Sequence, residues 1–234
     1  MRRDGLISVV KPDDPPLYPR LTGWARRRAM AHMLFADHGV FRTFFNTRTR
    51  VSDEMWRSSQ PLPYQVNGAA KLGIRTIVNL RGAGDNSFYR FEEEYCQRNG
   101  ITLMNFIVFS REAPKPETVL DAKSMFETLE YPALMHCKSG ADRAGLMSAL
   151  YLHFRKGAPI ETAMRQLSLR FGHMKQAKTG ILDFFLATYV AYNAKTPVPF
   201  ETWVREIYDR DAVTKAFRDS WWASVVTDRI MRRE

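Results

Sequence analysis

A thiol and a guanidinium group lie close together in residues 134–146, which read LMHCKSGADRAGL. The thiolate of Cys137 is a potential nucleophile, and the planar fork of Arg143 matches two oxygens of a phosphate group. An apolar run precedes these residues and a helical pattern follows them, which predicts a strand, a loop and a helix in that order. At such a junction the loop amides converge on one point, and the helix dipole adds partial positive charge. The segment therefore favours a phosphate-binding loop that also stabilises a thiolate.

The Cys-x5-Arg spacing is weak by itself, because an isolated cysteine is more often a small buried hydrophobe than a nucleophile. Gly140 strengthens the functional interpretation, since a tight loop needs the backbone freedom of glycine. Cys96 lies in FEEEYCQRNG without an arginine at the same spacing. We therefore predict that Cys96 packs in the core and that Cys137 is the reactive cysteine.

The segment HCKSGADRAG resembles the active-site loop of the cysteine-dependent phosphatases, the protein tyrosine and dual-specificity superfamily, whose pattern is His-Cys-x5-Arg. WRSSQP (56–61) and GIRTIVNLRG (73–82) are similar to segments of its bacterial dual-specificity-like branch. The resemblance covers residues 40–192 and implies no metal and no organic cofactor. It implies that Cys137 forms a phosphocysteine, that Arg143 binds the equatorial oxygens and that His136 orients the loop. The phosphate-binding residues that it implies are Lys138, Ser139, Gly140, Ala141, Asp142 and Arg143.

The chain departs from the family pattern in two ways. The residue after the arginine is usually Ser or Thr, whose hydroxyl helps to expel the thiolate, but here it is Ala144. The family's general acid is usually an Asp on a loop before the cysteine, and residues 105–117 contain none. Three general acids stay open: Asp142, placed as in myotubularin-type phosphoinositide phosphatases; Glu112, on the loop that we expect to be mobile; and Asp85.

The sequence leaves two classes of substrate. One is phosphotyrosine in proteins, and the other is an anionic phospholipid or other polyphosphorylated molecule. Lys138 favours the second, because HCK-x-G is similar to the loops of lipid phosphatases. We assign a basic rim around the site to Arg81, Arg111, Lys175 and Lys178. Gln176 is assigned the positioning of water. If the substrate is phosphotyrosine, we expect an aromatic wall from Phe88, Tyr89 or Phe109.

Two other classes of function remain as alternatives to a phosphatase. Ala144 and the missing loop Asp also suit a catalytically weak phosphate-binding module, a pseudophosphatase. A Cys-x5-Arg loop also occurs in some enzymes of persulfide and arsenate chemistry. Turnover separates the binding module from the hydrolase, and the flanking segments favour the phosphatase over the persulfide and arsenate enzymes.

The predicted elements alternate before they become purely helical, which indicates an α/β protein with a mainly parallel sheet flanked by helices and a helical C-terminal extension. Residues 1–20 contain four prolines and are predicted to be irregular. We expect strands at 43–51, 55–58, 74–80, 101–109 and 133–136, and helices at 21–36, 60–72, 88–98, 116–130, 144–192 (interrupted at 157–159 and 172) and 200–234. The expected domains are a basic extension (1–39), a catalytic domain (40–195) and the C-terminal extension (196–234).

Composition fits a globular protein: of the 234 residues 45% are hydrophobic, and 35 Lys and Arg against 25 Asp and Glu give a net charge of +10. No apolar run approaches the roughly 18 residues that would span a bilayer, and the apolar stretch at 6–10 is too short for a signal-peptide core, which predicts a cytoplasmic protein, with peripheral contact at the inner membrane face as an alternative. Residues 1–50 carry ten basic and four acidic residues, but no nucleic-acid-binding motif accompanies them.

Residues 21–38 give a weak amphipathic pattern, because Arg26, Arg27 and Arg28 are expected to point three ways. Trp221 and Trp222 are assigned to packing, with a membrane interface as the alternative.

Overall fold

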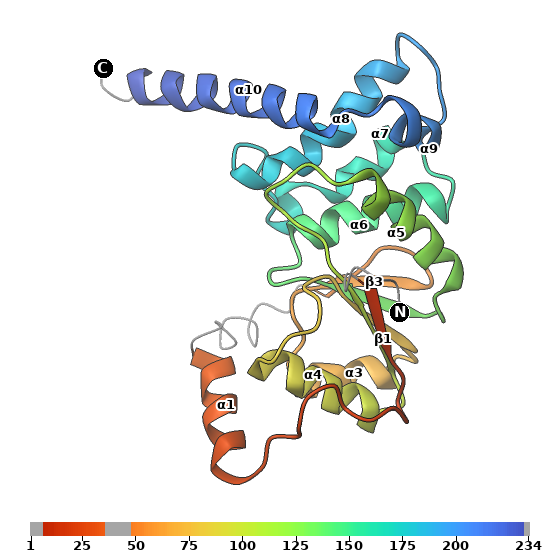
Figure 1. The fold of residues 1–234 in the computed structure, drawn as a ribbon, viewed down its shortest axis with the longest axis vertical. Coiled ribbons are helices and arrows are strands. Elements are labelled where there is room, and N and C mark those ends of the chain that lie inside the picture. Colours follow the sequence, from red (N-terminus) through yellow and green to blue (C-terminus); the bar gives the residue numbers. More distant parts are fainter. Residues whose placement is uncertain (1–6, 36–47, 232–234) are drawn as a thin grey trace. The chain divides into compact units, whose positions relative to one another are not determined.

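The computed structural model describes residues 7–35 and 48–231 (Figure 1), in two compact units. The first unit contains the described residues up to Val108 together with Thr128–Ala144. The second contains Phe109–Glu127 and the chain from Gly145 onward. The sheet and the Cys137 loop thus belong to the first unit, and the C-terminal helices belong to the second.

The first unit is built on a six-stranded sheet in the order β1-β5-β4-β6-β3-β2. Four neighbouring strands are parallel, and the two edge strands are antiparallel to their neighbours. The predicted mainly parallel sheet is therefore confirmed. The strand bounds are Ile7–Val10 (β1), Thr49–Arg50 (β2), Met55–Ser58 (β3), Thr76–Asn79 (β4), Thr102–Phe106 (β5) and Ala133–His136 (β6).

Strand β1 corrects the prediction that residues 1–20 are irregular. Its residues pair antiparallel with β5, from Ile7 opposite Phe106 to Val10 opposite Leu103. Val10 is buried, so this short segment contributes to the core as well as covering a sheet edge. The prolines lie after the strand and do not interrupt it. Of the strand expected at 43–51, residues 43–47 lie outside the described residues.

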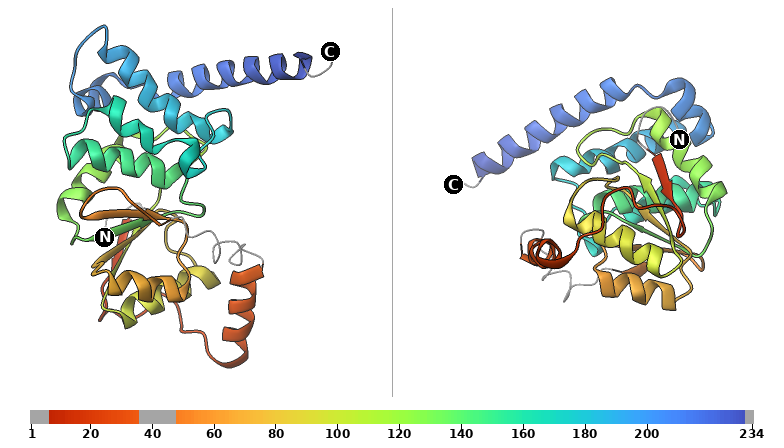
Figure 2. Two further views of the ribbon diagram at one scale, coloured as in Figure 1. Left: turned by 180° about the vertical axis from the view of Figure 1, so that it is seen from behind. Right: turned by 60° about the horizontal axis from the view of Figure 1, so that its bottom comes forward.

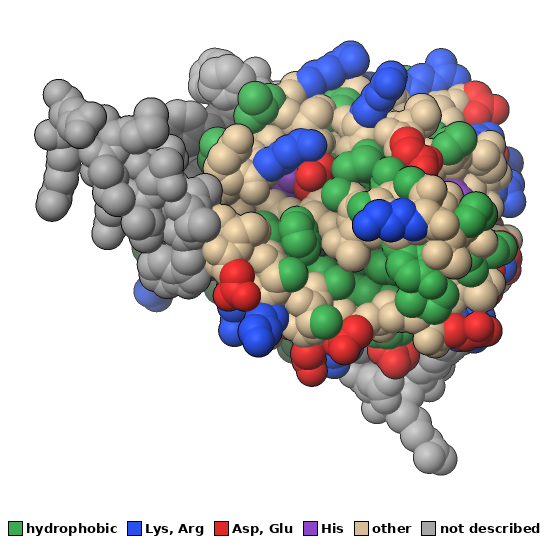
Figure 3. Space-filling view, turned by 90° about the horizontal axis from the view of Figure 1, so that it is seen from above, with side chains coloured by type: hydrophobic (Ala, Val, Ile, Leu, Met, Phe, Trp, Pro, Cys, Tyr) green, Lys and Arg blue, Asp and Glu red, His purple; other side chains and the backbone are tan. Residues whose placement is uncertain are grey.

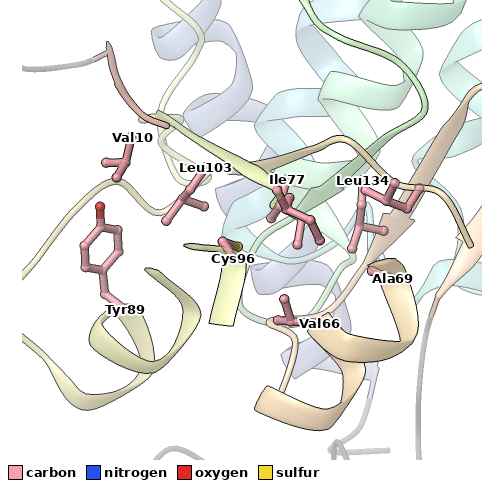
Figure 4. Close-up of a cluster of buried hydrophobic side chains, with 10 residues drawn as sticks. Val10, Val66, Ala69, Ile77, Tyr89, Cys96, Leu103 and Leu134 are labelled. Carbon is pink, nitrogen blue, oxygen red and sulfur yellow. The ribbon is translucent and has the colours of Figure 1, made fainter. Parts of the chain in front are cut away.

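Helices α3 (Pro63–Lys71) and α4 (Ser87–Arg98) lie side by side and pack on the sheet of the first unit (Figure 2). Their buried side chains meet strand residues such as Ile77 and Leu103 in one apolar cluster (Figure 4). Cys96 is fully buried in this cluster, which confirms that it packs in the core. Its burial raises the pKa of the Cys96 thiol well above the ordinary value.

The second unit is helical. Its helices are α5 (Pro116–Thr128, all but its last residue), α6 (Asp142–Phe154, from Gly145), α7 (Ile160–Ala163), α8 (Ile181–Asn193), α9 (Phe200–Thr202) and α10 (Arg210–Met231). Three 3-10 turns (Met164–Gln166, Leu169–Phe171, Lys178–Gly180) and a π-helical turn (Trp203–Ile207) complete it. On the face of Figure 3, described Lys and Arg side chains are interspersed with acidic and hydrophobic ones.

The C-terminal extension contributes to the core of this second unit. Phe200 and Trp203 are buried, and their rings lie close to those of Phe185 and Tyr189 on α8. Trp221 is half-buried, and its indole N–H donates to the carbonyl of Gln176 at 2.8 Å. The choice between packing and a membrane interface for the Trp221–Trp222 pair stays a prediction, since the side chain of Trp222 lies outside the described residues.

Candidate active site

The loop between β6 and α6 carries Cys137 at the carboxyl end of a central parallel strand. β6 ends at His136, whose carbonyl accepts a hydrogen bond from the amide of Leu80 at 2.9 Å, and α6 begins at Asp142. Cys137 is only 2% exposed, and its Sγ accepts a hydrogen bond from the amide of Gly140 at 3.3 Å. The loop therefore turns back so that the amide of Gly140 meets the sulfur, and it lies between a strand and a helix as the sequence pattern predicts.

Gly140 allows this curl for two reasons. Its φ of +78° is in the left-handed region, which favours glycine. A Cβ at this position would lie 2.8 Å from the carbonyl carbon of Ser58 and from the amide nitrogen of Ser59. The loop thus packs directly against the backbone that follows β3, and the amide of Gln60 also donates to the carbonyl of Lys138 at 3.3 Å.

Arg57, on β3, holds the loop from behind. It is 1% exposed, and its Nη2 donates to the carbonyls of Gly140 at 2.6 Å and Ala141 at 2.9 Å. Burial lowers the pKa of Arg57 to about 10, while the charges of Cys137 and Asp142 act in the opposite direction. These bonds turn the two carbonyls toward Arg57. Arg57 was missed by sequence reasoning, although an arginine inside the strand MWRS is a detectable signal.

His136 is held by a buried carboxylate on α4. Its Nε2 lies 2.6 Å from Oε1 of Glu92, both side chains are fully buried, and its Nδ1 lies 3.4 Å from the carbonyl of Cys137. The ring is therefore fixed beside the loop, which fits the predicted orienting role of His136. Glu92 was also missed, because nothing in FEEEY marks one of three successive glutamates as the partner of a residue 44 positions later.

The remaining loop residues differ in exposure. Lys138 and Ser139 are exposed, Ala141 is buried, and Asp142 and Arg143 are half-buried. Nη1 of Arg143 lies 3.5 Å from the carbonyl of Leu80, at the limit of a hydrogen bond. Ala144 is fully buried and supplies no hydroxyl. The six residues predicted to bind phosphate, 138–143, lie in the first unit, on the loop after Cys137 and at the start of α6.

The three candidate general acids lie in different surroundings. Asp142 begins α6 on the loop itself, and its charge acts on Arg57. Asp85 is exposed and forms an ion pair with Arg90. Glu112 belongs to the second unit, where Oε2 lies 2.7 Å from Nη2 of Arg210. Of the three, only Asp142 is on the loop that carries Cys137.

The predicted basic rim is divided between the two units. In the first unit, Nη1 of Arg81 donates to Oε1 of Gln60 at 2.9 Å, and its guanidinium lies 3.6 Å from the centre of the Phe88 ring. In the second, Lys175 lies 3.3 Å from Asp183. The other predicted rim residues there, Arg111 and Lys178, are exposed, as is Gln176.

One of the three residues predicted to form an aromatic wall, Tyr89, was predicted wrongly. Tyr89 does not line a pocket, because it is fully buried in the core and its hydroxyl accepts a hydrogen bond from Asn105 at 3.0 Å. Phe88 is half-buried beneath Arg81, and Phe109, in the second unit, is exposed. Within the described ranges no cluster of three His, Cys, Asp or Glu side chains is arranged to hold a metal ion.

Comparison with known proteins gives one family and one curated relative. Residues 35–181 match the family model described as a DSP-PTPase phosphatase fused to NAD+ kinase. The chain is 26% identical over 135 residues to an Arabidopsis thaliana protein named inositol diphosphatase DSP3, a match that spans 50% of this chain and 65% of that protein.

Solved structures resemble the chain at lower identity. P. aeruginosa TpbA is 19% identical with a TM-score of 0.47, over 74% of this chain and 91% of that one. PTPMT1 is 15% identical with a TM-score of 0.44, over 64% of this chain and 99% of that one.

Proposed function

This chain belongs to the DSP-PTPase phosphatase family, and from that premise we propose that it hydrolyses phosphomonoesters through a phosphocysteine intermediate. The observation that carries the proposal is the amide of Gly140 lying 3.3 Å from Sγ of Cys137, on the loop that also carries Arg143. A loop amide in that position stabilises a thiolate and is poised for the oxygens of a bound phosphate.

In the first step the thiolate of Cys137 attacks phosphorus, an S–P bond forms, and the P–O bond to the leaving group breaks. Arg143 and the loop amides bind the three equatorial oxygens, where negative charge must be stabilised in the transition state. Arg57 and His136 do not touch substrate. They position the loop, Arg57 through two carbonyls and His136 between Glu92 and the carbonyl of Cys137.

The leaving alkoxide needs a proton, and Asp142 is our first choice of donor because it lies on the same loop. Glu112 and Asp85 remain the alternatives, and each is already in an ion pair with an arginine. A matched test compares Asp142→Asn, Glu112→Gln and Asp85→Asn on esters with good and poor leaving groups. Loss confined to poor leaving groups identifies the acid, because a good leaving group departs without protonation.

In the second step water attacks phosphorus, the S–P bond breaks, and inorganic phosphate and the thiolate are released. Ala144 offers no hydroxyl to help the sulfur leave, so this step is expected to be slow unless Ser139 or a water replaces it. The same observation supports the alternative function, a phosphate-binding module with little turnover. A burst of leaving-group release equal to the enzyme concentration, without a steady state, would favour that alternative.

For the substrate we propose a polyphosphorylated or anionic lipid-type phosphomonoester, in preference to phosphotyrosine. Lys138 is exposed on the loop, where a second anionic group of a substrate can meet it. The curated relative is named an inositol diphosphatase, which fits a highly charged substrate. A phosphotyrosine pocket was expected to have an aromatic wall. Tyr89, one of its three candidate residues, cannot contribute to such a wall because its side chain is part of the core.

The deciding experiment measures phosphate release from a phosphotyrosine peptide, inositol polyphosphates, phosphoinositides and phosphatidylglycerophosphate. Cys137→Ser is expected to abolish release, whereas Cys96→Ala, which removes the other thiol, is expected to retain it in protein that remains folded. Lys138→Gln is expected to weaken kcat/KM for polyphosphorylated substrates more than for the peptide. Release that survives Cys137→Ser would overturn the mechanism, and preference for the peptide would overturn the substrate class.

A further inference from the structure

The outer face of helix α1 (Gly23–Phe35) is formed by Trp24, Arg27, Arg28 and Ala31, at helical spacings of three and four residues. All four residues are exposed. Trp24 keeps 77% of its surface accessible, the largest value among the exposed large hydrophobic side chains in the part of the chain that the structure describes. A single exposed hydrophobic side chain is common at protein surfaces, so what distinguishes Trp24 is the pair of arginines on the same face of the helix.

The opposite face attaches α1 to α4, beside which it lies in Figures 1 and 2. Met33 is buried in a small cluster with Phe91. Nη1 of Arg26 lies 2.5 Å from Oε2 of Glu94, and its guanidinium lies 4.9 Å from the centre of the Phe91 ring. The three successive arginines were expected to point three ways. Instead, Arg26 packs against α4, and Arg27 and Arg28 both belong to the outer face.

The chemistry of the outer face fits the boundary between water and an anionic bilayer. Tryptophan concentrates at that boundary, because its ring is apolar while its indole N–H remains hydrated or bonded to head groups. Arginine side chains one turn away are attracted by the negative surface potential of anionic lipids. Neither Arg27 nor Arg28 forms an ion pair with a carboxylate of the described residues, so their charge is not neutralised there. No helix of the described chain is long and apolar enough to cross a membrane, so the contact we consider is peripheral.

We propose that the outer face of α1 binds an anionic phospholipid surface, with Trp24 in the interface and Arg27 and Arg28 against the head-group phosphates. The face belongs to the first unit and uses no residue of the Cys137 loop. The proposal therefore stands apart from the proposed hydrolysis, and Cys137→Ser is expected to bind vesicles as the unaltered chain does.

The test is co-sedimentation of the full chain with phosphatidylcholine vesicles, with and without phosphatidylglycerol. We expect binding only to the anionic vesicles. Arg27→Gln/Arg28→Gln should weaken the partition coefficient about 30-fold, since each arginine near such a surface contributes about fivefold. Trp24→Ala should weaken it roughly tenfold through lost apolar burial. The matched control is Arg165→Gln/Arg170→Gln, two exposed arginines of the second unit, which carries the same loss of charge.

A second measurement locates the tryptophan directly. Quenching of fluorescence by brominated lipid, taken as the difference between the unaltered chain and Trp24→Phe, should show Trp24 within reach of the acyl chains. The proposal is overturned if the unaltered chain ignores anionic vesicles, if the control pair lowers binding as much as the α1 pair, or if Trp24 is not quenched. Binding of polyglutamate through Arg27 and Arg28 without vesicle binding would instead indicate an acidic protein partner.

Discussion

Replacing Gly140 by alanine tests whether the Cys137 loop depends on one close backbone approach. The added Cβ would lie 2.8 Å from two backbone atoms of Ser58 and Ser59, whereas ordinary contact begins at 3.4 Å, so the two segments must separate by about 0.6 Å (3.4 − 2.8). That movement also stretches the bond from Arg57 to the Gly140 carbonyl, now 2.6 Å. Alanine at a φ of +78° costs about 1 kcal/mol in addition.

Together these terms predict a loss of about 2–4 kcal/mol in the free energy of unfolding. Displacement of the loop amides by this amount should also lower kcat for phosphate release about 100-fold. The matched control is Gly73→Ala, at a φ of +76° with no atom within 4 Å of the added Cβ, which isolates the dihedral cost. It should lose only about 1 kcal/mol and keep its activity.

Urea denaturation and phosphate-release kinetics on both variants provide the comparison. The structure attributes the difference between the variants to contact with the Ser58–Ser59 backbone. If Gly140→Ala is no less stable than Gly73→Ala and turns over normally, the loop does not depend on that contact and our account of it is wrong.

Three further predictions concern buried groups around the same loop. Arg57→Lys keeps a positive charge but replaces Nη2, which donates to both carbonyls from a rigid planar group, with an ammonium on a flexible stem, so kcat should fall at least tenfold; unchanged kcat in steady-state assays would show that the loop needs no such support. Glu92→Gln removes the buried carboxylate that lies 2.6 Å from Nε2 of His136 and should lower the free energy of unfolding by about 1–3 kcal/mol in urea titration, because a buried polar group loses its partner. In the native protein at pH 8, iodoacetamide should alkylate Cys137, with protection by inorganic phosphate. Cys96 should remain unmodified, because its raised pKa keeps it a thiol where an ordinary cysteine is partly ionised. Peptide mass spectrometry checks this, and modification of Cys96 in folded protein would contradict it.

Local pattern was enough to predict the central strands and the loop. The run before His136 predicts β6, whose bounds were predicted correctly, and Gly140 predicts the tight turn after it. Strand β1 was not predictable in the same way, because it is stabilised by pairing with β5, about 95 residues further along the chain, and by burial of Val10 in the core.

Arg57 and Glu92 were missed for a related reason. Each acts through a partner that is distant in sequence, and each is a charged residue that ordinarily lies at the surface. Residue type and spacing identify the groups that can touch a phosphate. They do not identify the buried groups that hold those residues in place, because that information exists only in the folded chain.

Hydrogen bonds and an ion pair join residues 112–114 to residues 208–210, and they bear on the order in which the protein folds during synthesis. Arg210 reaches the carbonyl of Ala113 at 2.8 Å and the carboxylate of Glu112, and the hydroxyl of Tyr208 donates to the carbonyl of Pro114 at 2.8 Å. These partners are more than 90 residues apart. During synthesis the 112–114 segment therefore leaves the ribosome long before Tyr208 and Arg210 exist, and these contacts form only after residue 210 has been translated.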